Sequence, residues 1–280
     1  MRIHAFQTGT VSIKERQREG KGRGLQRILN TQLDKHWTEQ LPIYVWAIEH
    51  PEGIIVIDTG ETARVNEPGY LSRWQRSHPS AHFELQPEEE IGPQLRAVGI
   101  SPDDVRWVVM THLHMDHDGG LAHFPKAEIL VSRAEYRTAS GLTGKLLGYL
   151  PQYWPTWFAP RLIDFTPQPF GPFPAHYALT KAKDVWLVPT TGHSAGHLSV
   201  ILQEENSAIF FAGDTSYTQD LLLAGAIDGV STKEREARQT ISRIQHYLQT
   251  VPTVYLPSHD PDGAKRLAER TIAITAVPAA

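Results

Sequence analysis

Residues 111–120 concentrate side chains that could bind a metal ion. They read Thr-His-Leu-His-Met-Asp-His-Asp-Gly-Gly, so that three histidines and two aspartates fall within seven positions. Imidazole nitrogens and carboxylate oxygens are the ligands that a borderline-soft divalent ion such as zinc accepts. Packing so many titratable groups together is costly unless something pairs them. The stretch therefore predicts a metal site.

A predicted strand positions this cluster. Residues 105–110, directly before it, form a short run rich in β-branched and aromatic side chains, which is typical of a buried strand. His112 and His114 lie two residues apart and point the same way if the backbone stays extended. Asp116 and His117 follow where the chain must turn, so they can face a second point in space.

Three more predicted strands lead to a histidine or an aspartate. They are residues 185–188, before His193, residues 208–211, before Asp214, and residues 253–257, before His259. Each polar residue has an ordinary explanation by itself: Asp214 could shape a loop, and His259 could lie on the surface. Because all of them follow apolar strands, as the first cluster does, together they suggest one site.

Two hairpins and one helix complete the predicted framework. Residues 41–48 and 54–57 flank a His-Pro-Glu-Gly turn and predict a hairpin that ends in Asp58. Asp58 could be a metal ligand, but we expect it to form hydrogen bonds that fix the loop. Residues 198–202 and 208–211 predict a second hairpin. Residues 231–234 match a capping box. The helix that they would start has its apolar residues on one face, namely Ala237, Ile241, Ile244 and Leu248.

Two segments depart from this regular pattern. Residues 14–27 are basic and glycine-rich; they could contact an anionic ligand, but we interpret them as a solvated loop. Residues 139–183 predict an ordered insertion, because nine aromatic residues and seven prolines between Tyr149 and Tyr177 disfavour a regular helix or a central strand. The insertion either covers a hydrophobic face or forms a wall of a pocket for an apolar substrate portion. We expect a single domain over residues 1–280.

The composition narrows the classes of function. The chain is 40% hydrophobic and 21% charged with a net charge of −4, which offers no electrostatic case for nucleic acid as a partner. It has no cysteine, so disulfides, thiolate metal sites and cysteine nucleophiles are excluded. The first residues lack the apolar core of a signal peptide, and no apolar run is long enough to span a membrane. We expect a cytoplasmic protein; a homodimer is left open.

Five motifs resemble those of the metallo-β-lactamase superfamily and occur in that family's order, between about residues 43 and 260. They are residues 57–60 (Ile-Asp-Thr-Gly), 111–120, 192–197 (Gly-His-Ser-Ala-Gly-His), 211–214 (Phe-Ala-Gly-Asp) and 258–259 (Ser-His). The resemblance implies an α/β fold, an αββα sandwich of the metallo-β-lactamase type, with a dinuclear metal site at the sheet edges.

The same resemblance assigns the metal ligands. His112, His114 and His193 would hold the first ion, and Asp214 would bridge to the second, whose remaining ligands would be Asp116, His117 and His259. The cofactors would be two divalent ions, with zinc expected and cobalt, manganese or iron as alternatives. His123, His197 and Asp118 are interpreted as structural.

The local sequence Asp-Thr-Ser-Tyr-Thr at residues 214–218 resembles N-acyl homoserine lactone lactonases, in which a tyrosine three residues beyond the bridging aspartate reaches the substrate. This implies that a metal-bridging hydroxide opens a lactone ring. Tyr217 would donate to the carbonyl oxygen, and Asp116 or Asp214 would pass the proton to the leaving alkoxide. The substrate would be a small molecule with an apolar acyl portion, and the enzyme would act in quorum quenching.

Several alternatives stay open. Tyr217 could be a packed loop aromatic. Thioester hydrolases of the glyoxalase II type, phosphotriesterases and β-lactamase-like enzymes would use the same ligands, and a non-catalytic sensor could use the same pocket to bind a ligand.

Overall fold

Each of two units of the chain is built on one β-sheet. The computed structural model describes residues 1–71, 80–142, 144–231 and 233–274. The first unit comprises Met1–Glu15 and Asp34–Leu162, and the second comprises Arg16–Leu33 and Ile163–Ala280. A short N-terminal segment, residues 16–33, is therefore packed with the C-terminal half of the chain.

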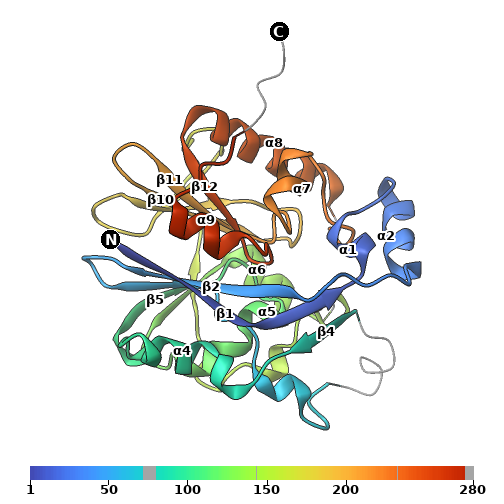
Figure 1. The fold of residues 1–280 in the computed structure, drawn as a ribbon, viewed down its shortest axis with the longest axis horizontal. Coiled ribbons are helices and arrows are strands. Elements are labelled where there is room, and N and C mark those ends of the chain that lie inside the picture. The colour runs from blue at the N-terminus through green and yellow to red at the C-terminus, as the bar shows by residue number, and fades with distance from the viewer. Residues whose placement is uncertain (72–79, 143, 232, 275–280) are drawn as a thin grey trace. The chain divides into compact units, whose positions relative to one another are not determined.

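The first unit contains a mixed, seven-stranded sheet (Figure 1) with the strand order β4-β1-β2-β3-β5-β6-β7. Its strands are β1 (Arg2–Ile13), β2 (Leu41–Glu49), β3 (Ile54–Ile57), β4 (Ala81–Glu84), β5 (Val105–Val109), β6 (Glu128–Ser132) and β7 (Arg161–Ile163). The predicted hairpin of β2 and β3 is confirmed. Strands β3, β5 and β6 are parallel, so their C-terminal ends share one edge, where the polar loop after β5 begins.

Helices and short turns cover one face of this sheet. They are η1 (Ala63–Asn66), η2 (Pro87–Glu89), α4 (Ile91–Ala97), η3 (Pro102–Asp104), α5 (Met115–Asp118), η4 (Gly119–His123), α6 (Arg133–Ala139), η5 (Gly144–Leu147) and η6 (Pro151–Tyr153). Helix α4 buries Ile91 and Leu95 in the core cluster that contains Val108 of β5. Trp154 and Phe158 of the predicted insertion pack against the same cluster, so this part covers a hydrophobic face.

The second unit contains a five-stranded sheet in the order β12-β11-β10-β9-β8. Its strands are β8 (Tyr177–Ala178), β9 (Val185–Pro189), β10 (Leu198–Gln203), β11 (Ala208–Gly213) and β12 (Thr253–Pro257). Strand β10 is antiparallel to both β9 and β11, while β12 is parallel to β11. Strands β9, β11 and β12 therefore end at the same edge of the sheet.

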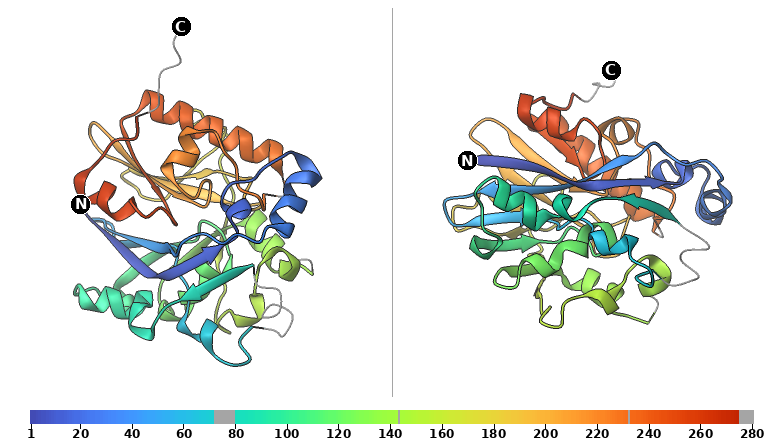
Figure 2. Two further views of the ribbon diagram at one scale, coloured as in Figure 1. Left: turned by 45° about the vertical axis from the view of Figure 1, so that its right-hand side comes forward. Right: turned by 60° about the horizontal axis from the view of Figure 1, so that its bottom comes forward.

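The helices of the second unit are α1 (Glu15–Arg18), which begins at the boundary, α2 (Gly24–Leu33), α7 (Gln219–Leu223), α8 (Glu234–Thr250) and α9 (Gly263–Glu269). Figures 1 and 2 show α8 running along the five-stranded sheet. Its predicted apolar face is confirmed, because Ile241 and Ile244 are buried against Phe210 and Tyr255 of that sheet.

The predicted capping box is wrong. Helix α8 begins after Lys233, and the hydroxyl of Ser231 donates instead to a carboxylate oxygen of Asp228, at 2.7 Å. Thr232 lies outside the described residues. An oxygen of the Asp228 carboxylate also accepts from the Ser231 backbone N–H, so this loop is organised by a local aspartate rather than by the helix terminus.

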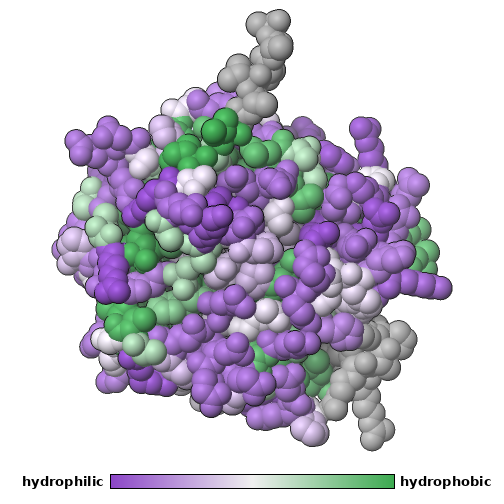
Figure 3. Space-filling view, viewed as in Figure 1, coloured by the Kyte–Doolittle hydropathy of each residue, from purple (hydrophilic) through white to green (hydrophobic). Residues whose placement is uncertain are grey.

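The interpretation of residues 14–27 as a solvated loop is wrong in part. Residues 19–23 lie outside helices and residues 21–26 are exposed, but residues 15–18 form α1, residues 24–27 form the start of α2, and Arg27 is only 1% exposed. Helix α2 buries polar residues and exposes Leu25, Leu29 and Leu33 at 80%, 53% and 74%. Figure 3 shows hydrophobic atoms at the place where Figure 1 draws α2. None of the described helices combines the length and apolar character needed to cross a bilayer.

Candidate functional site

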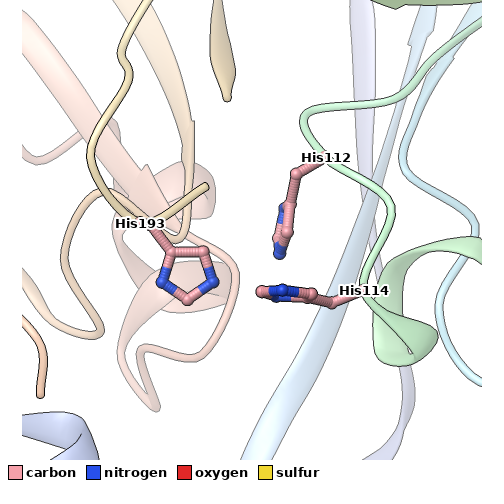
Figure 4. Close-up of side chains that lie close together, drawn as sticks. All are labelled: His112, His114 and His193. Atoms are coloured by element: carbon pink, nitrogen blue, oxygen red, sulfur yellow. The ribbon is translucent and has the colours of Figure 1, made fainter. Parts of the chain in front are cut away.

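The loop that follows β5 brings together the first predicted ligands. His112 and His117 are almost fully buried, with ring centroids 4.0 Å apart, and the rings of His112 and His114 meet edge to face at 4.6 Å (Figure 4). His117 and Asp116 lie on the short helix α5, where Nε2 of the histidine is 3.9 Å from a carboxylate oxygen of the aspartate. The strand end thus presents imidazole nitrogens and a carboxylate within one small volume.

Asp58 fixes this loop from the neighbouring strand. Because β3 and β5 are parallel, with Ile57 beside Val109, the end of β3 lies next to the start of the loop. The Asp58 carboxylate accepts hydrogen bonds from the backbone and side chain of Thr111, at 2.7 and 2.8 Å, and from Nδ1 of His117, at 2.9 Å. The hydrogen-bonding role expected for Asp58 is what the structure shows. The bond also defines the tautomer of His117, whose Nε2 then carries the lone pair.

Glu135 of helix α6 and Tyr149, which follows η5, support the same loop. Glu135 is 1% exposed, and its Oε1 accepts from the backbone N–H of Leu113, at 3.1 Å, and from the hydroxyl of Tyr149, at 2.9 Å. Nε2 of His114 is 3.1 Å from the carbonyl oxygen of Leu147, so a proton on that nitrogen donates to it and leaves the lone pair on Nδ1. The backbone between the two histidines and the ring of His114 are therefore held by separate contacts.

Two further buried carboxyl groups lie close to this loop. Burial raises the pKa of Asp118 to about 8, although the hydrogen bond from the indole N–H of Trp154 and the charge of His117 lower it. Burial likewise raises the pKa of Glu61 well above its usual value, against the hydrogen bond from the backbone of Thr62. Both groups hold the proton more strongly than an exposed carboxyl does. The structural role expected for Asp118 agrees with its bond to Trp154.

The second unit assembles the other predicted ligands at the shared end of β9, β11 and β12. The Asp214 carboxylate lies between two histidines: one oxygen is 3.6 Å from Nε2 of His193, and the other is 3.4 Å from Nε2 of His259. All three side chains are buried. Two imidazoles and a carboxylate thus converge at this sheet edge, as the strand-end pattern predicted.

Tyr217 completes this group. It is 3% exposed, and its ring stacks on that of His259 with centroids 5.4 Å apart. Its hydroxyl accepts a long hydrogen bond, 3.5 Å, from the side chain of Gln17. The basic N-terminal segment therefore reaches the tyrosine that the sequence singled out, a contact that no sequence signal indicated.

His197 has the structural role expected for it. Its Nε2 accepts from the backbone N–H of Asp214, at 3.0 Å, so its Nδ1 carries the proton and donates to the hydroxyl of Thr190, at 2.9 Å. This histidine holds the backbone on which the proposed bridging carboxylate is mounted.

Asp228 is a site residue that the sequence did not indicate. Its Oδ2 is 3.2 Å from Nδ1 of His193, and both side chains are buried. Burial works to raise the pKa of Asp228, but the hydrogen bond and charge of His193 and the hydrogen bonds of Ser231 outweigh it and lower the pKa below its usual value. The sequence around Asp228, Ala-Ile-Asp-Gly-Val-Ser, follows no strand and matches no ligand spacing, so it carried no signal. Glu135 was missed for the same reason, as one acid within a short helix.

The side chains gathered at these strand ends are of the types that bind a divalent metal ion. Buried imidazoles whose second nitrogen is bound by a carboxylate are characteristic of metal-ligating histidines, and His117 with Asp58 and His193 with Asp228 both show this arrangement. The remaining donors are nitrogen and carboxylate oxygen, which suit zinc and its neighbours.

Residues 38–259 match the sequence profile of the family described as Metallo-beta-lactamase superfamily. The chain belongs to this superfamily. The fold class predicted from the sequence is thereby confirmed, as two mixed sheets with helices in the metallo-beta-lactamase fold.

Relatives of this superfamily member are lactonases by name. The N-acyl homoserine lactonase AttM of Rhizobium radiobacter is 25% identical over 274 residues, which cover 94% of each chain. An N-acyl homoserine lactonase of Bacillus cereus is 30% identical over 183 residues, or 64% of this chain and 66% of the relative. A mutant of AiiA from B. thuringiensis, with N-decanoyl-L-homoserine bound at its active site, shares the fold with a TM-score of 0.76 at 22% identity, over 94% of both chains.

Proposed function

We propose that this superfamily member is a metal-dependent hydrolase that opens the lactone ring of N-acyl homoserine lactones, and so acts in quorum quenching. The observation that carries the proposal is the group at the end of β11: Asp214 between two histidines, with Tyr217 stacked on one of them. The similarity to AttM, whose name states this activity, extends over 94% of the chain.

We further infer two bound divalent ions, with zinc expected. The first would be held by His112, His114 and His193. Its companion would be held by Asp116, His117 and His259, and Asp214 would bridge the two. What supports this assignment is the grouping of donors within each unit and the membership of residues 38–259 in the superfamily. When bound, such ions lower the pKa of a water molecule and polarise the substrate carbonyl.

Residues of the chain would then orient the ester, stabilise the negative charge on its carbonyl oxygen and transfer a proton to the leaving oxygen. The hydroxyl group of Tyr217 is suited to donate a hydrogen bond to the carbonyl oxygen as negative charge develops there. Asp116 or Asp214 would carry a proton to the ring oxygen as it leaves. Burial of Tyr217 and Asp214 excludes bulk water, which strengthens both interactions.

We also propose that the part of the substrate beyond the lactone ring is apolar. Trp154 and Phe158 of the predicted insertion pack against the core of the first unit, and Trp157 of the same segment is 39% exposed. Whether the insertion contacts an acyl chain is tested by the comparison of short- and long-chain lactones below. A cytoplasmic location stays a prediction of the sequence.

A homodimer is proposed on a separate observation. Leu25, Leu29 and Leu33 form an exposed stripe along α2. An exposed apolar surface of this kind often marks an interface with another protein. Most soluble oligomers consist of copies of one chain, most often as two-fold symmetric dimers, so we propose that a second copy covers this stripe.

One experiment tests the function directly. Purified protein is assayed for hydrolysis of short- and long-chain N-acyl homoserine lactones, a thioester, an aryl phosphotriester and a β-lactam, and its metal content is measured on the same sample. Lactone turnover with two metal ions per chain is the expected result. Turnover of only one of the other substrates would replace the lactonase proposal with that activity, and bound metal without any turnover would favour a ligand sensor.

A further inference from the structure

The turn at residues 228–231 is held by hydrogen bonds on both of its sides. On the inner side, Oδ1 of Asp228 accepts from the backbone N–H groups of Val230 and Ser231, at 2.8 and 2.5 Å. On the outer side, the guanidinium of Arg27 donates to the carbonyl oxygens of Asp228, at 2.6 Å, and of Ser231. A turn without regular secondary structure is thus clamped between its own carboxylate and an arginine far away in the sequence.

The segment that carries Arg27 is fitted closely to this turn. The backbone N–H of Gly20 donates to the carbonyl oxygen of Ile227, at 2.9 Å, and that of Gly229 donates to the carbonyl oxygen of Gln17, at 2.8 Å. A Cβ atom on Gly229 would come within 2.0 Å of the carbonyl oxygen of Arg16. Only glycine allows the two backbones to approach this closely.

The hydrogen bonds that Arg27 donates to the turn offset the free-energy cost of burying its charge. A guanidinium with 1% exposure is expensive unless its donors are used, and the nearest carboxylate, that of Glu234, is 3.9 Å from its Nε. Its two terminal nitrogens instead serve the two carbonyl oxygens of one turn. The planar fork of arginine can span such a pair, whereas the ammonium of lysine is a single point.

The inner side of the turn faces His193. Oδ2 of Asp228 is 3.2 Å from Nδ1 of that histidine, so the carboxylate selects the tautomer with the proton on Nδ1. The lone pair is then on Nε2, which points towards Asp214 at 3.6 Å. A histidine held in this way is oriented and made more basic as a ligand.

We propose that Asp228 is the positioning residue of His193, and that Arg27 acts through Asp228, so that the N-terminal segment 16–33 sets the affinity of the first metal site. This inference rests on the proposed function, because it takes His193 to be a metal ligand. It assigns a role to a segment that the sequence presents as a basic, glycine-rich loop.

The central variant is Asp228→Asn. The amide keeps an oxygen for the backbone N–H groups of the turn, but its NH₂ group opposes the Nδ1–H of His193 and favours the other tautomer. The zinc dissociation constant of one of the two sites should rise about 10- to 100-fold, measured by competition with a chromogenic chelator. The absorption spectrum of the cobalt-substituted protein should change in the same variant, and the second site should keep its affinity.

Arg27→Met should also raise the zinc dissociation constant of the site weakened by Asp228→Asn, because the turn loses the hydrogen bonds on its outer side. The double variant should be no weaker than Asp228→Asn alone, since a residue that acts through another has no effect of its own once the other is lost. Fully additive losses would overturn the link between Arg27 and Asp228.

Arg161→Met is the matched control. It removes an exposed arginine of β7 that pairs with Glu128 at 3.1 Å in the first unit, whereas the turn and Glu234 belong to the second, and it should leave both zinc affinities unchanged. Circular dichroism of each metal-free variant reports whether it folds. Should Asp228→Asn fail to fold, Ser231→Ala removes only a hydroxyl that supports Oδ2 and should still raise the dissociation constant.

The outcomes separate this inference from the proposed function. Wild-type protein that binds two metal ions and hydrolyses lactones, while folded Asp228→Asn binds both ions equally well, would overturn the positioning role alone. Wild-type protein that binds no divalent metal would overturn the proposed function and this inference with it.

Discussion

Single side chains of this protein are held by carboxylates that fix their protonation and direction. Asp58 binds His117, Asp228 binds His193, and Glu135 holds the loop between the first two histidines. Such contacts convert a flexible imidazole into a ligand with one available nitrogen. The chemistry at the residue scale therefore depends on acids that the motifs themselves do not contain.

Tyr217→Phe tests the donor assigned to the carbonyl oxygen. The variant keeps the ring that stacks on His259, so metal content should not change, while kcat for the lactone should fall roughly 100-fold. Steady-state kinetics and metal analysis on one sample give both quantities. Tyr247→Phe, which changes a buried tyrosine of α8, is the control. A loss of at most ~2-fold would remove Tyr217 from the mechanism.

Asp58→Asn tests the support of His117. The residue has a positive φ of 59°, which asparagine tolerates, so the backbone should be retained while the carboxylate that binds Nδ1 is lost. We expect metal affinity at one site to fall about 10- to 100-fold in a chelator competition. Asp103→Asn, which removes a surface partner of Lys126, should have no effect. Equal affinities in the two variants would contradict the supporting role.

Elements of the fold place these residues through strand direction. In each unit, polar loops follow the ends of strands that share one edge: β3 and β5 in the first, and β9, β11 and β12 in the second. Helices α4 and α8 bury apolar side chains in the core of their own units, whereas α2 exposes its leucines and so reverses the usual pattern. That reversal follows from Arg27, which turns the polar face of α2 inward.

Ile244→Ala tests the packing of α8 on its sheet. Ile244 is fully buried against the core of the second unit, so the truncation should lower the free energy of unfolding by about 2–5 kcal/mol. Urea denaturation of the metal-free protein provides the measurement. Gln239→Ala, on the exposed side of the same helix, should change stability by no more than about 0.5 kcal/mol. Similar losses in both variants would argue against this packing.

Leu29→Glu tests the leucine stripe of α2. A charge in the middle of an apolar interface should convert the proposed dimer into a monomer, as measured by light scattering coupled to size-exclusion chromatography. Because residue 29 is exposed in the chain by itself, the melting temperature of the monomer should not fall. Wild-type protein that is already monomeric at high concentration would refute the dimer.

At the scale of the whole molecule, the proposed metal ions draw their ligands from distant parts of the chain. Binding of a ligand to the folded state alone stabilises it by mass action, in proportion to the logarithm of the ligand concentration over its dissociation constant. The ions are therefore expected to contribute to folding as well as to chemistry. The net charge and the composition are ordinary for a globular protein, so we expect no comparable effect of either on the stability of the fold.

Metal removal should lower the melting temperature. At a free zinc concentration 100 times the dissociation constant, each site contributes about 2.7 kcal/mol, which chelation would remove. Differential scanning calorimetry of metal-loaded and chelator-treated protein measures the shift, and readdition of zinc should reverse it. Identical melting temperatures for the two samples would count against ions bound specifically to the folded state.

The sequence by itself determined the framework and the ligand candidates, because both are written in local patterns. Apolar runs specified β5, β9, β11 and β12, and the polar residues after them were visible as motifs. Periodicity likewise specified the buried face of α8. These features depend on residues that are neighbours in the chain, so short-range reasoning finds them.

Only the tertiary structure decided which residues hold the ligands in place. Arg27 and Asp228 are separated by 201 positions, and neither lies in a recognisable motif. The sequence favoured a solvated loop at Arg27 and a capping box at Ser231, because composition and spacing carry no information on contacts between distant segments. The pairing of a buried arginine with one turn, and of that turn with His193, exists only once the chain is folded.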